Sequence, residues 1–390
     1  MINRMGREDF GGKPRQDPIP KQNEHGNGTA CLSSLSLDFS SPLCYLGIPL
    51  MSFRRRSRVR RSVLPASALL VAACIILSGA CGKEEAGTAK TKHALRLAVI
   101  PMGTTHEFWK AIHAGAKRAA EELGVEIIWK GPLKEDDRNE QIQIVEAMIS
   151  AGVDALILSP LDDRALVPPV EEAKKLGIPT IIFNSALSGN LHVAFVATDN
   201  RKGGVLAAER IGSLMQGRGK LILLRIIEGV EGNRQREEGF LETIRTKFPG
   251  ITIVSDNQYA GITTETAYQT TENLLSRFHD VDAIFTPNES TTFGCLRALE
   301  DHGLAGKVIH VGFDTSRKLI EALEKRELAG LVLQDPIRMG YDSVKTAVAY
   351  LKGEPYQKII DTGVVMATPE NMDQADIKRL LVPDLSVLGR

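Results

Sequence analysis

The stretch LRLAVIPMGTTHEFWKAIHAGAKRAAEELG, residues 95–124, decides how the rest of the chain is interpreted. It opens with the short apolar run Leu95–Ile100, which Pro101 ends, as expected of a parallel strand covered on both faces. From Ala111 onwards, small and apolar residues recur at three- and four-residue spacing opposite lysine, arginine and glutamate, which predicts a helix with one buried face. Gly124 then ends the helix as a C′ glycine. The stretch is one strand–loop–helix unit.

The same unit recurs along the chain. Apolar runs of strand length alternate with amphipathic stretches, and we expect strands at Val125–Trp129, Ala155–Leu158, Thr180–Phe183, Val193–Ala197, Lys220–Arg225, Thr252–Asn257, Ala283–Thr286 and Lys307–Val311. Single helices between strands imply right-handed crossovers and parallel sheets. The fold class expected is therefore α/β, with two doubly wound parallel-sheet lobes and a cleft between them that suits a small ligand.

The last segments come too late to extend the second lobe simply. These segments are Leu328–Gln334, Pro336–Lys352 and Ile359–Val365, and the return of a strand and a helix to the first lobe would make the lobes exchange segments and would create a hinge of several strands. We expect an N-terminal lobe of residues 95–198 with 335–363 and a C-terminal lobe of residues 199–334 with 364–380. The backbone should bend near residues 198–199, 334–335 and 364–365, because domain closure is absorbed by a few residues at element ends.

The first 94 residues differ from the rest in composition. Residues 1–50 lack any sustained period and are interpreted as a disordered region or a mis-assigned start. Residues 51–80 combine an arginine-rich run with an apolar stretch and a small-residue cluster before Cys81, the layout of a bacterial lipoprotein signal, and residues 81–94 form a polar tether. Cys74 is the competing lipidation site, and an uncleaved membrane anchor is the alternative to cleavage.

Composition excludes several classes of function. The formal net charge of the 390 residues is zero, which does not favour nucleic acid as a partner. After Cys81 the only cysteine is Cys295, so the mature chain has no disulfide framework and no cysteine metal cluster. No Ser-His-Asp set, zinc-binding helix or pair of catalytic carboxylates stands out. We expect no enzyme activity, no metal and no cofactor.

The loop after the first strand holds the first candidate ligand residues. In an open parallel sheet the crevice lies beyond the carboxyl ends of the strands, where His106, Phe108 and Trp109 fall. Two aromatic rings at the start of a helix can equally belong to the core or to an N-terminal staple. This loop alone does not separate the two interpretations.

The ordered motifs of the chain resemble a known family. They are Glu107–Trp109 (EFW), Gly152–Pro160 (GVDALILSP), Leu176–Pro179 (LGIP), Thr198–Asn200 (TDN), Arg234–Phe240 (RQREEGF), Pro287–Glu289 (PNE), Val311–Asp314 (VGFD) and Leu333–Pro336 (LQDP). Together they resemble the type I periplasmic sugar-binding proteins of the ribose-, galactose- and allose-binding group, from about Leu95 to about Pro369. The resemblance implies that Phe108 and Trp109 help to sandwich a sugar ring.

The resemblance also implies polar contacts to sugar hydroxyls. These would come from Arg236, Asn288, Asp314 and Gln334, while His106 falls where ribose binders have an asparagine. One departure concerns Asn184-Ser185, which stands where the family usually has Asp-Arg. The pocket should be less charged and roomier there, so a sugar other than ribose is as compatible as ribose itself.

Three of these residues have ordinary structural alternatives. An aspartate after a strand, such as Asp314, is often the N-cap of the next helix. Arg236 lies in a charge-rich helix and could belong to its solvated face. Asn288 fits an Asx turn.

The function expected is that of a sugar-binding lipoprotein of an ATP-binding-cassette (ABC) importer. Its partners would be a monosaccharide-sized sugar, a membrane permease and, through a lipid on Cys81, the periplasmic side of the cell envelope. We expect a monomer. A sensor module that presents its closed form to a membrane receptor would use the same hinge, and the sequence does not separate the two.

Overall fold

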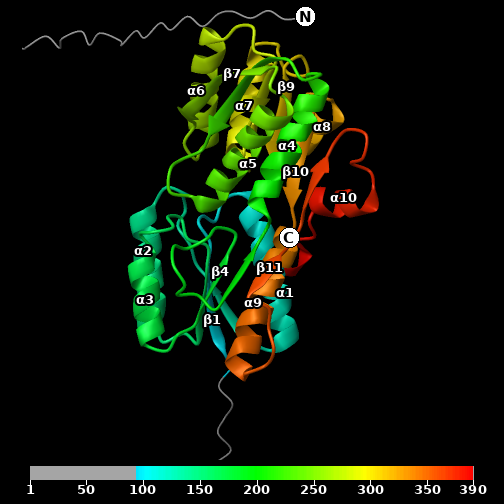
Figure 1. Cartoon of the computed structure of the whole chain (residues 1–390). Helices are drawn as coiled ribbons and strands as arrows, with labels where there is room; N and C mark the ends of the chain where they lie inside the picture. The colour runs from blue at the N-terminus through cyan, green and yellow to red at the C-terminus, as the bar shows by residue number, and fades with distance from the viewer. Residues whose placement is uncertain (1–93, 390) are drawn as a thin grey trace, which may run out of the picture. The chain divides into compact units, whose positions relative to one another are not determined.

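Strands and helices alternate in residues 94–389, the part of the chain that this computed structural model describes (Figure 1). The exceptions lie between β4 (Thr180–Phe183) and β5 (Ala194–Ala197) and between β11 (Ile359–Asp361) and β12 (Val364–Ala367), where one strand follows another without a helix. The expectations for residues 1–93, including the signal segment and lipidation at Cys81, fall outside these residues. Within residues 94–389 no helix is both long and apolar enough to span a bilayer.

The first sheet is parallel throughout and has six strands in the order β11-β5-β4-β3-β1-β2. These are β1 (Arg96–Ile100), β2 (Glu126–Trp129), β3 (Ala155–Leu158), β4 (Thr180–Phe183), β5 (Ala194–Ala197) and β11 (Ile359–Asp361). Alternate residues along β1 pack against α1 (Glu107–Leu123) and α9 (Pro336–Lys352) on one face, and against α2 (Arg138–Ser150) and α3 (Val167–Lys175) on the other. Because both faces are covered, the strands have the continuous apolar composition seen in the sequence.

The second sheet repeats this plan in the order β12-β10-β9-β8-β6-β7. Its strands are β6 (Gly219–Arg225), β7 (Ile251–Tyr259), β8 (Ala283–Phe285), β9 (Ile309–Phe313), β10 (Gly330–Gln334) and β12 (Val364–Ala367), and only β12 is antiparallel to its neighbour. One face is covered by α4 (Asn200–Leu214) and α5 (Glu231–Lys247). The other is covered by α6 (Thr264–Arg277), α7 (Glu289–Asp301), α8 (Arg317–Glu324) and α10 (Ala375–Leu381). The expected fold class, two doubly wound α/β lobes, is confirmed.

Three connections carry the chain between the two sheets. They follow β5, β10 and β11, at residues 198–199, 335 and 362–363. The segment Ile359–Val365 holds the whole of β11 in the first sheet and the start of β12 in the second. Gly363 separates the two strands with a φ of 89°, a left-handed conformation that breaks an extended run.

The end of the chain makes a fourth connection, which the sequence analysis did not foresee. After α10, which packs on the second sheet, residues 382–388 return to the first lobe. There Lys117 Nζ donates to the carbonyl oxygen of Val387 at 2.8 Å, and Arg118 pairs with the carboxylate of Asp384 at 2.6 Å. The described chain therefore links the lobes a fourth time, beyond the three expected hinge segments.

Glycines allow α1 and α9 to pack closely. A Cβ atom added at Gly115 would lie 1.9 Å from the carbonyl oxygen of Ile337, and one added at Gly340 would lie 2.1 Å from that of Ile112. Neither helix can accept a side chain at these points without moving. This contact fixes the N-terminal end of α1, where the candidate ligand residues lie.

Candidate ligand-binding site

The candidate site lies where the carboxyl ends of the strands of both sheets meet. One cavity is lined by all eight residues that the sequence analysis singled out: His106, Phe108, Trp109, Asn184, Arg236, Asn288, Asp314 and Gln334. They follow or end β1, β4, β6, β8, β9 and β10. Side chains far apart in the sequence converge here because the two lobes share one strand order, with carboxyl ends directed at the same cleft.

His106 belongs to a partly buried ion pair. Its Nδ1 lies 2.6 Å from Oε1 of Glu135, which stands in the loop between β2 and α2. Burial disfavours the charged imidazole, but the hydrogen bond and negative charge of Glu135 outweigh it and raise the pKa of His106 to about 9. At neutral pH His106 is therefore a cation.

Phe108 and Trp109 meet edge to face, with ring centroids 5.0 Å apart and planes at 76°. Trp109 is only 3% exposed, packs edge-on against Phe183 and donates its indole N–H to Glu135 at 2.5 Å. Both interpretations of the aromatic pair, as core residues and as cavity residues, apply to Trp109. It belongs to the first lobe's core and also lines the cavity. The pair presents rings at an angle and cannot by itself form the two parallel faces of a sandwich.

Arg236 is a buried cation and does not lie on a solvated helix face. Its Nε donates to Oδ1 of Asn200 and one NH1 to the carbonyl oxygen of Pro287, both at 2.8 Å. The guanidinium carbon lies 3.8 Å from the ring centroid of Phe313, so a flat cation is stacked on an aromatic face. Burial lowers the pKa of Arg236 to about 10, which leaves it charged at neutral pH.

Asp314 faces Arg236 and Gln334. Its Oδ2 lies 3.8 Å from Arg236 NH1, and its Oδ1 accepts a 2.7 Å hydrogen bond from Gln334 Nε2. Burial raises the pKa of Asp314, while the nearby guanidinium opposes that rise. The alternative interpretation of Asp314 as a helix cap does not hold, because the side chain of Ser316 caps α8.

The remaining two predicted residues have structural bonds as well as a place in the cavity wall. Asn288 accepts from the backbone N–H of Thr291 and so caps α7, as the Asx alternative proposed. Asn184 adopts a left-handed φ of 61° and donates to Ser159 Oγ at 3.2 Å. Ser185, next to it, accepts from the backbone N–H of Gly232 in the opposite lobe.

Sequence reasoning missed two carboxylates in the cavity, Glu135 and Glu289. Glu289 directly follows Asn288 in the quoted PNE motif, and its Oε2 accepts from the backbone N–H of Phe108 across the cleft at 3.3 Å. Burial raises the pKa of Glu289 to about 7. Glu289 could have been found from the sequence because it stands after a strand's carboxyl end, whereas Glu135 is one of five charged residues in a row.

The lobes are closed on each other around this site. Besides the bonds of Ser185 and Glu289, the backbone N–H of Asp163 in the first lobe donates to the carbonyl oxygen of Gly229 in the second at 3.2 Å. The cavity holds about 40 Å³, enough for a few water molecules and too little for a sugar ring.

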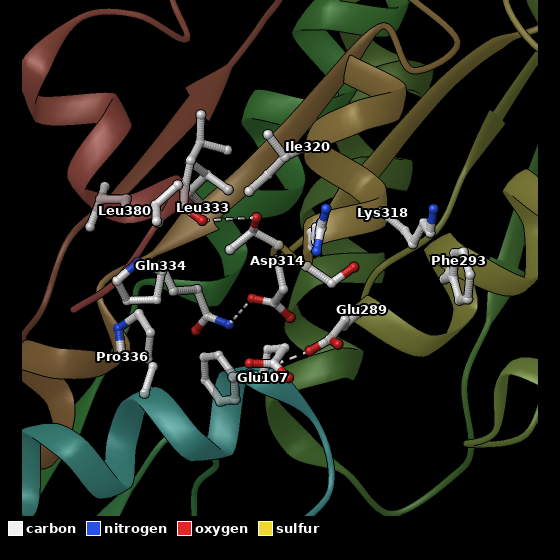
Figure 2. A pocket seen from close by; sticks show the side chains of 18 of the residues that line it. Glu107, Glu289, Phe293, Asp314, Lys318, Ile320, Leu333, Gln334, Pro336 and Leu380 are labelled. Carbon is white, nitrogen blue, oxygen red and sulfur yellow. Dashed lines mark hydrogen bonds between the residues drawn. The ribbon is translucent and has the colours of Figure 1, made fainter. Parts of the chain in front are cut away.

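A second, larger hollow adjoins the cavity (Figure 2). This side groove, of about 760 Å³, lies between the start of α1, helices α7 and α8 and the C-terminal segment 380–385. It shares a wall with the cavity, formed by Phe108, Glu289, Asp314 and Gln334.

The chain matches known proteins over the same region. A family model described as a periplasmic binding protein domain matches residues 97–355, more than half of the chain. The ribose import binding protein RbsB of Haemophilus influenzae is 30% identical over 275 residues, which cover 70% of this chain and 90% of that protein.

Solved structures agree with this match. A carbohydrate transporter solute-binding protein from Agrobacterium radiobacter, in complex with D-arabinose, is 32% identical with a TM-score of 0.72, covering 75% of this chain and 100% of that one. An ABC transporter solute-binding protein from Agrobacterium vitis with bound D-fucose is 33% identical with a TM-score of 0.71, covering 74% and 100%. The chain belongs to the periplasmic binding protein family, in its type I sugar-binding group. It is a binding protein and not an enzyme.

Proposed function

We propose that this protein is the sugar-binding component of an ABC-type carbohydrate importer. The observation that carries the proposal is the set of Arg236, Asp314 and Gln334, which is held by the second lobe and faces the aromatic pair of the first. A pyranose has apolar faces that pack on rings and a rim of hydroxyls that pair with carboxylates, amides and guanidinium. The related solute-binding proteins with bound D-arabinose and D-fucose support a monosaccharide-sized ligand.

In this proposal the ligand joins the two lobes. Phe108 packs against an apolar face of the sugar, with Trp109 behind it, while His106, Arg236, Asp314 and Gln334 pair with hydroxyls. Asn184 and Asn288 complete the rim. Closure then buries the sugar between the two sheets, and the segments at residues 198–199, 335 and 362–363 bend to allow it. The permease would recognise the closed form.

A thermal-shift screen tests the proposal. Purified protein is heated with pentoses, hexoses and, as a non-sugar control, amino acids of similar size. A true ligand at a hundred times its dissociation constant should add about 2.7 kcal/mol to the free energy of unfolding. If no sugar raises the melting temperature at millimolar concentration, the proposal fails.

We also propose that Cys81 carries a lipid that anchors the protein at the periplasmic side of the envelope. The support is the order of features in the sequence, a basic run, an apolar run and small residues before Cys81. In cells fed a labelled fatty acid, Cys81→Ser should abolish labelling, whereas Cys74→Ser, the matched control, should keep it. The reverse result would assign the lipid to Cys74.

A further inference from the structure

The carboxylate of Glu289 makes no ion pair with the residues that the structure describes, although the charge of His106 acts on it from beyond ion-pair distance and lowers its pKa. It caps the N-terminal end of α1 from the opposite lobe, through the backbone N–H of Phe108, because the side chain of the N-cap residue His106 makes no capping bond. No lysine, arginine or histidine nitrogen of residues 94–389 lies within the 4.0 Å of an ion pair. Glu289 is partly buried, and an ionised carboxylate without a direct counter-ion is costly in such a position.

The cations nearby are committed to other acids. His106 pairs with Glu135, and Arg236 lies 3.8 Å from Asp314. At the rim of the side groove, Lys110 pairs with Glu107 at 2.6 Å and Lys318 with Glu321 at 3.0 Å. His106 offsets the charge of Glu289 only from a distance, so direct pairing of this carboxylate has to come from a proton or from a ligand.

A second observation points to a ligand at the same place. Gln334 is 3% exposed, and its Oε1 is buried without a hydrogen-bond partner. The orientation of the Gln334 amide is set by Asp314. Its carboxylate can only accept a hydrogen bond, so the Nε2 donor of Gln334 faces Asp314 and Oε1 faces away. The unpaired oxygen lies in the wall shared by the cavity and the side groove, where Figure 2 shows Gln334, Asp314 and Glu289 converging.

The charges of the cavity do not balance. Its wall holds the cations His106 and Arg236 and the carboxylates Glu135, Glu289 and Asp314, so with all of them ionised one negative charge remains. A sugar hydroxyl could pair with Gln334 Oε1 but would leave that charge uncompensated. An ammonium group would donate to the amide oxygen and to the carboxylates, and would also neutralise the excess.

We propose that the ligand of this site is an amino sugar, whose ammonium binds at the corner formed by Glu289, Asp314 and Gln334. This inference rests on the proposed sugar-binding function and names the chemical class of the sugar. The hydroxyls of the ring keep the contacts described above, and the ammonium shares the carboxylate of Asp314 with Arg236, which lies 3.8 Å from it. The ammonium replaces the proton that Glu289 would otherwise hold at neutral pH.

Isothermal titration calorimetry at about pH 7.5 tests the inference. The probes are D-glucosamine, D-galactosamine and D-mannosamine, each with its parent hexose and its N-acetyl derivative. Because hydrogen bonds to charged groups are about twice as strong as neutral ones, one hexosamine should bind about tenfold or more tightly than its parent. The N-acetyl derivative, which has no charge, should bind more weakly than the hexosamine.

Substitutions at Glu289 test whether this residue causes the preference for the hexosamine. Glu289→Gln should remove the preference for the hexosamine over its parent, and Glu289→Asp should retain part of it. Glu321→Gln, an acid of the side groove that does not line the cavity, is the matched control and should change neither affinity.

The outcomes separate this inference from the function on which it rests. If parent hexoses or pentoses bind and no hexosamine binds more tightly, the inference is overturned and the sugar-binding function stands. An equal gain for the N-acetyl derivative, or a preference that survives in Glu289→Gln, also overturns it. If no sugar of any kind binds, the proposed function itself is wrong. Should Glu289→Gln not fold, the wild-type comparison of hexosamine and parent still decides.

Discussion

Replacing Asp314 with asparagine removes the charge at the centre of the proposed site and little else. The residue has a left-handed φ of 66°, which asparagine tolerates and alanine does not favour. Ser316 caps α8, so the helix keeps its cap, and the new amide oxygen can still accept from Gln334. We therefore expect Asp314→Asn to fold with a melting temperature close to that of the wild type.

We expect Asp314→Asn to bind the sugar more weakly, because an amide makes weaker hydrogen bonds to sugar hydroxyls than the carboxylate does. Oδ1 already accepts from Gln334, and each oxygen can take one sugar hydroxyl. A hydrogen bond to a charged group contributes about 1.5–3 kcal/mol and a neutral one about 0.5–1.5 kcal/mol, so two weakened bonds cost about 2 kcal/mol. The amide NH₂ also points a donor at Arg236, which brings the total to about 2–5 kcal/mol, at least a thirtyfold rise in Kd.

Calorimetric titration with the best sugar from the thermal-shift screen measures this change. Asp342→Asn, the same substitution in an exposed pair with Arg338 on α9, is the control and should bind as the wild type does. An Asp314→Asn protein whose Kd stays within twofold of the wild-type value would refute the reasoning, and the site would have to lie elsewhere.

Three further predictions follow from particular contacts. Sugar binding should change intrinsic fluorescence in the wild type and in Trp129→Phe but not in Trp109→Phe, because Trp109 lines the cavity and Trp129 stacks on His113 outside it. The free energy of unfolding should fall by roughly 1.4 kcal/mol per pH unit from pH 6.5 towards pH 3 because of His310, whose pKa burial lowers to about 3. The unfolded chain binds this proton and the folded one does not, so His310→Gln should weaken the acid dependence in urea titrations; an unchanged slope would contradict this. Gly115→Ala should lower the free energy of unfolding by about 1–3 kcal/mol or more, since its Cβ would lie 1.9 Å from a backbone oxygen of α9, and an unchanged urea midpoint would contradict the close packing.

Much of the fold could be predicted because buried parallel strands and their covering helices leave local patterns. The runs at Ala155–Leu158 and Thr180–Phe183 became β3 and β4 with the expected bounds. Contacts between segments far apart in the sequence left no such local pattern. The short segment from Ile359 to Ala367 gave two strands in different sheets, β11 and β12, with only Thr362 and Gly363 between them. The return of residues 382–388 to α1 depends on Lys117 and Arg118, which in the sequence are ordinary residues of a solvated helix face.

In the candidate site, too, some residues could be predicted from local sequence patterns and others could not. Residues that directly follow a strand or end it, such as Asp314 and Gln334, could be placed because parallel strands bring their carboxyl ends together. Glu135 could not, because nothing local distinguishes it from Lys134 or Asp136. Only the packing of α1 shows that Glu135 is the acid that binds both His106 and the Trp109 indole.

The central claim is that a sugar closes the two lobes over the cavity. The most direct test is the distance between spin labels at Asn139 in the first lobe and Gln258 in the second, both exposed and next to residues that line the cleft mouth. Both positions are changed to cysteine in a chain whose cysteines before residue 94 are serine, while Cys295 is buried and should not react. Pulsed electron–electron double resonance should show a shorter and narrower distance distribution when the sugar is added at saturation. A distribution that stays unchanged while calorimetry shows the sugar bound would contradict closure around the ligand.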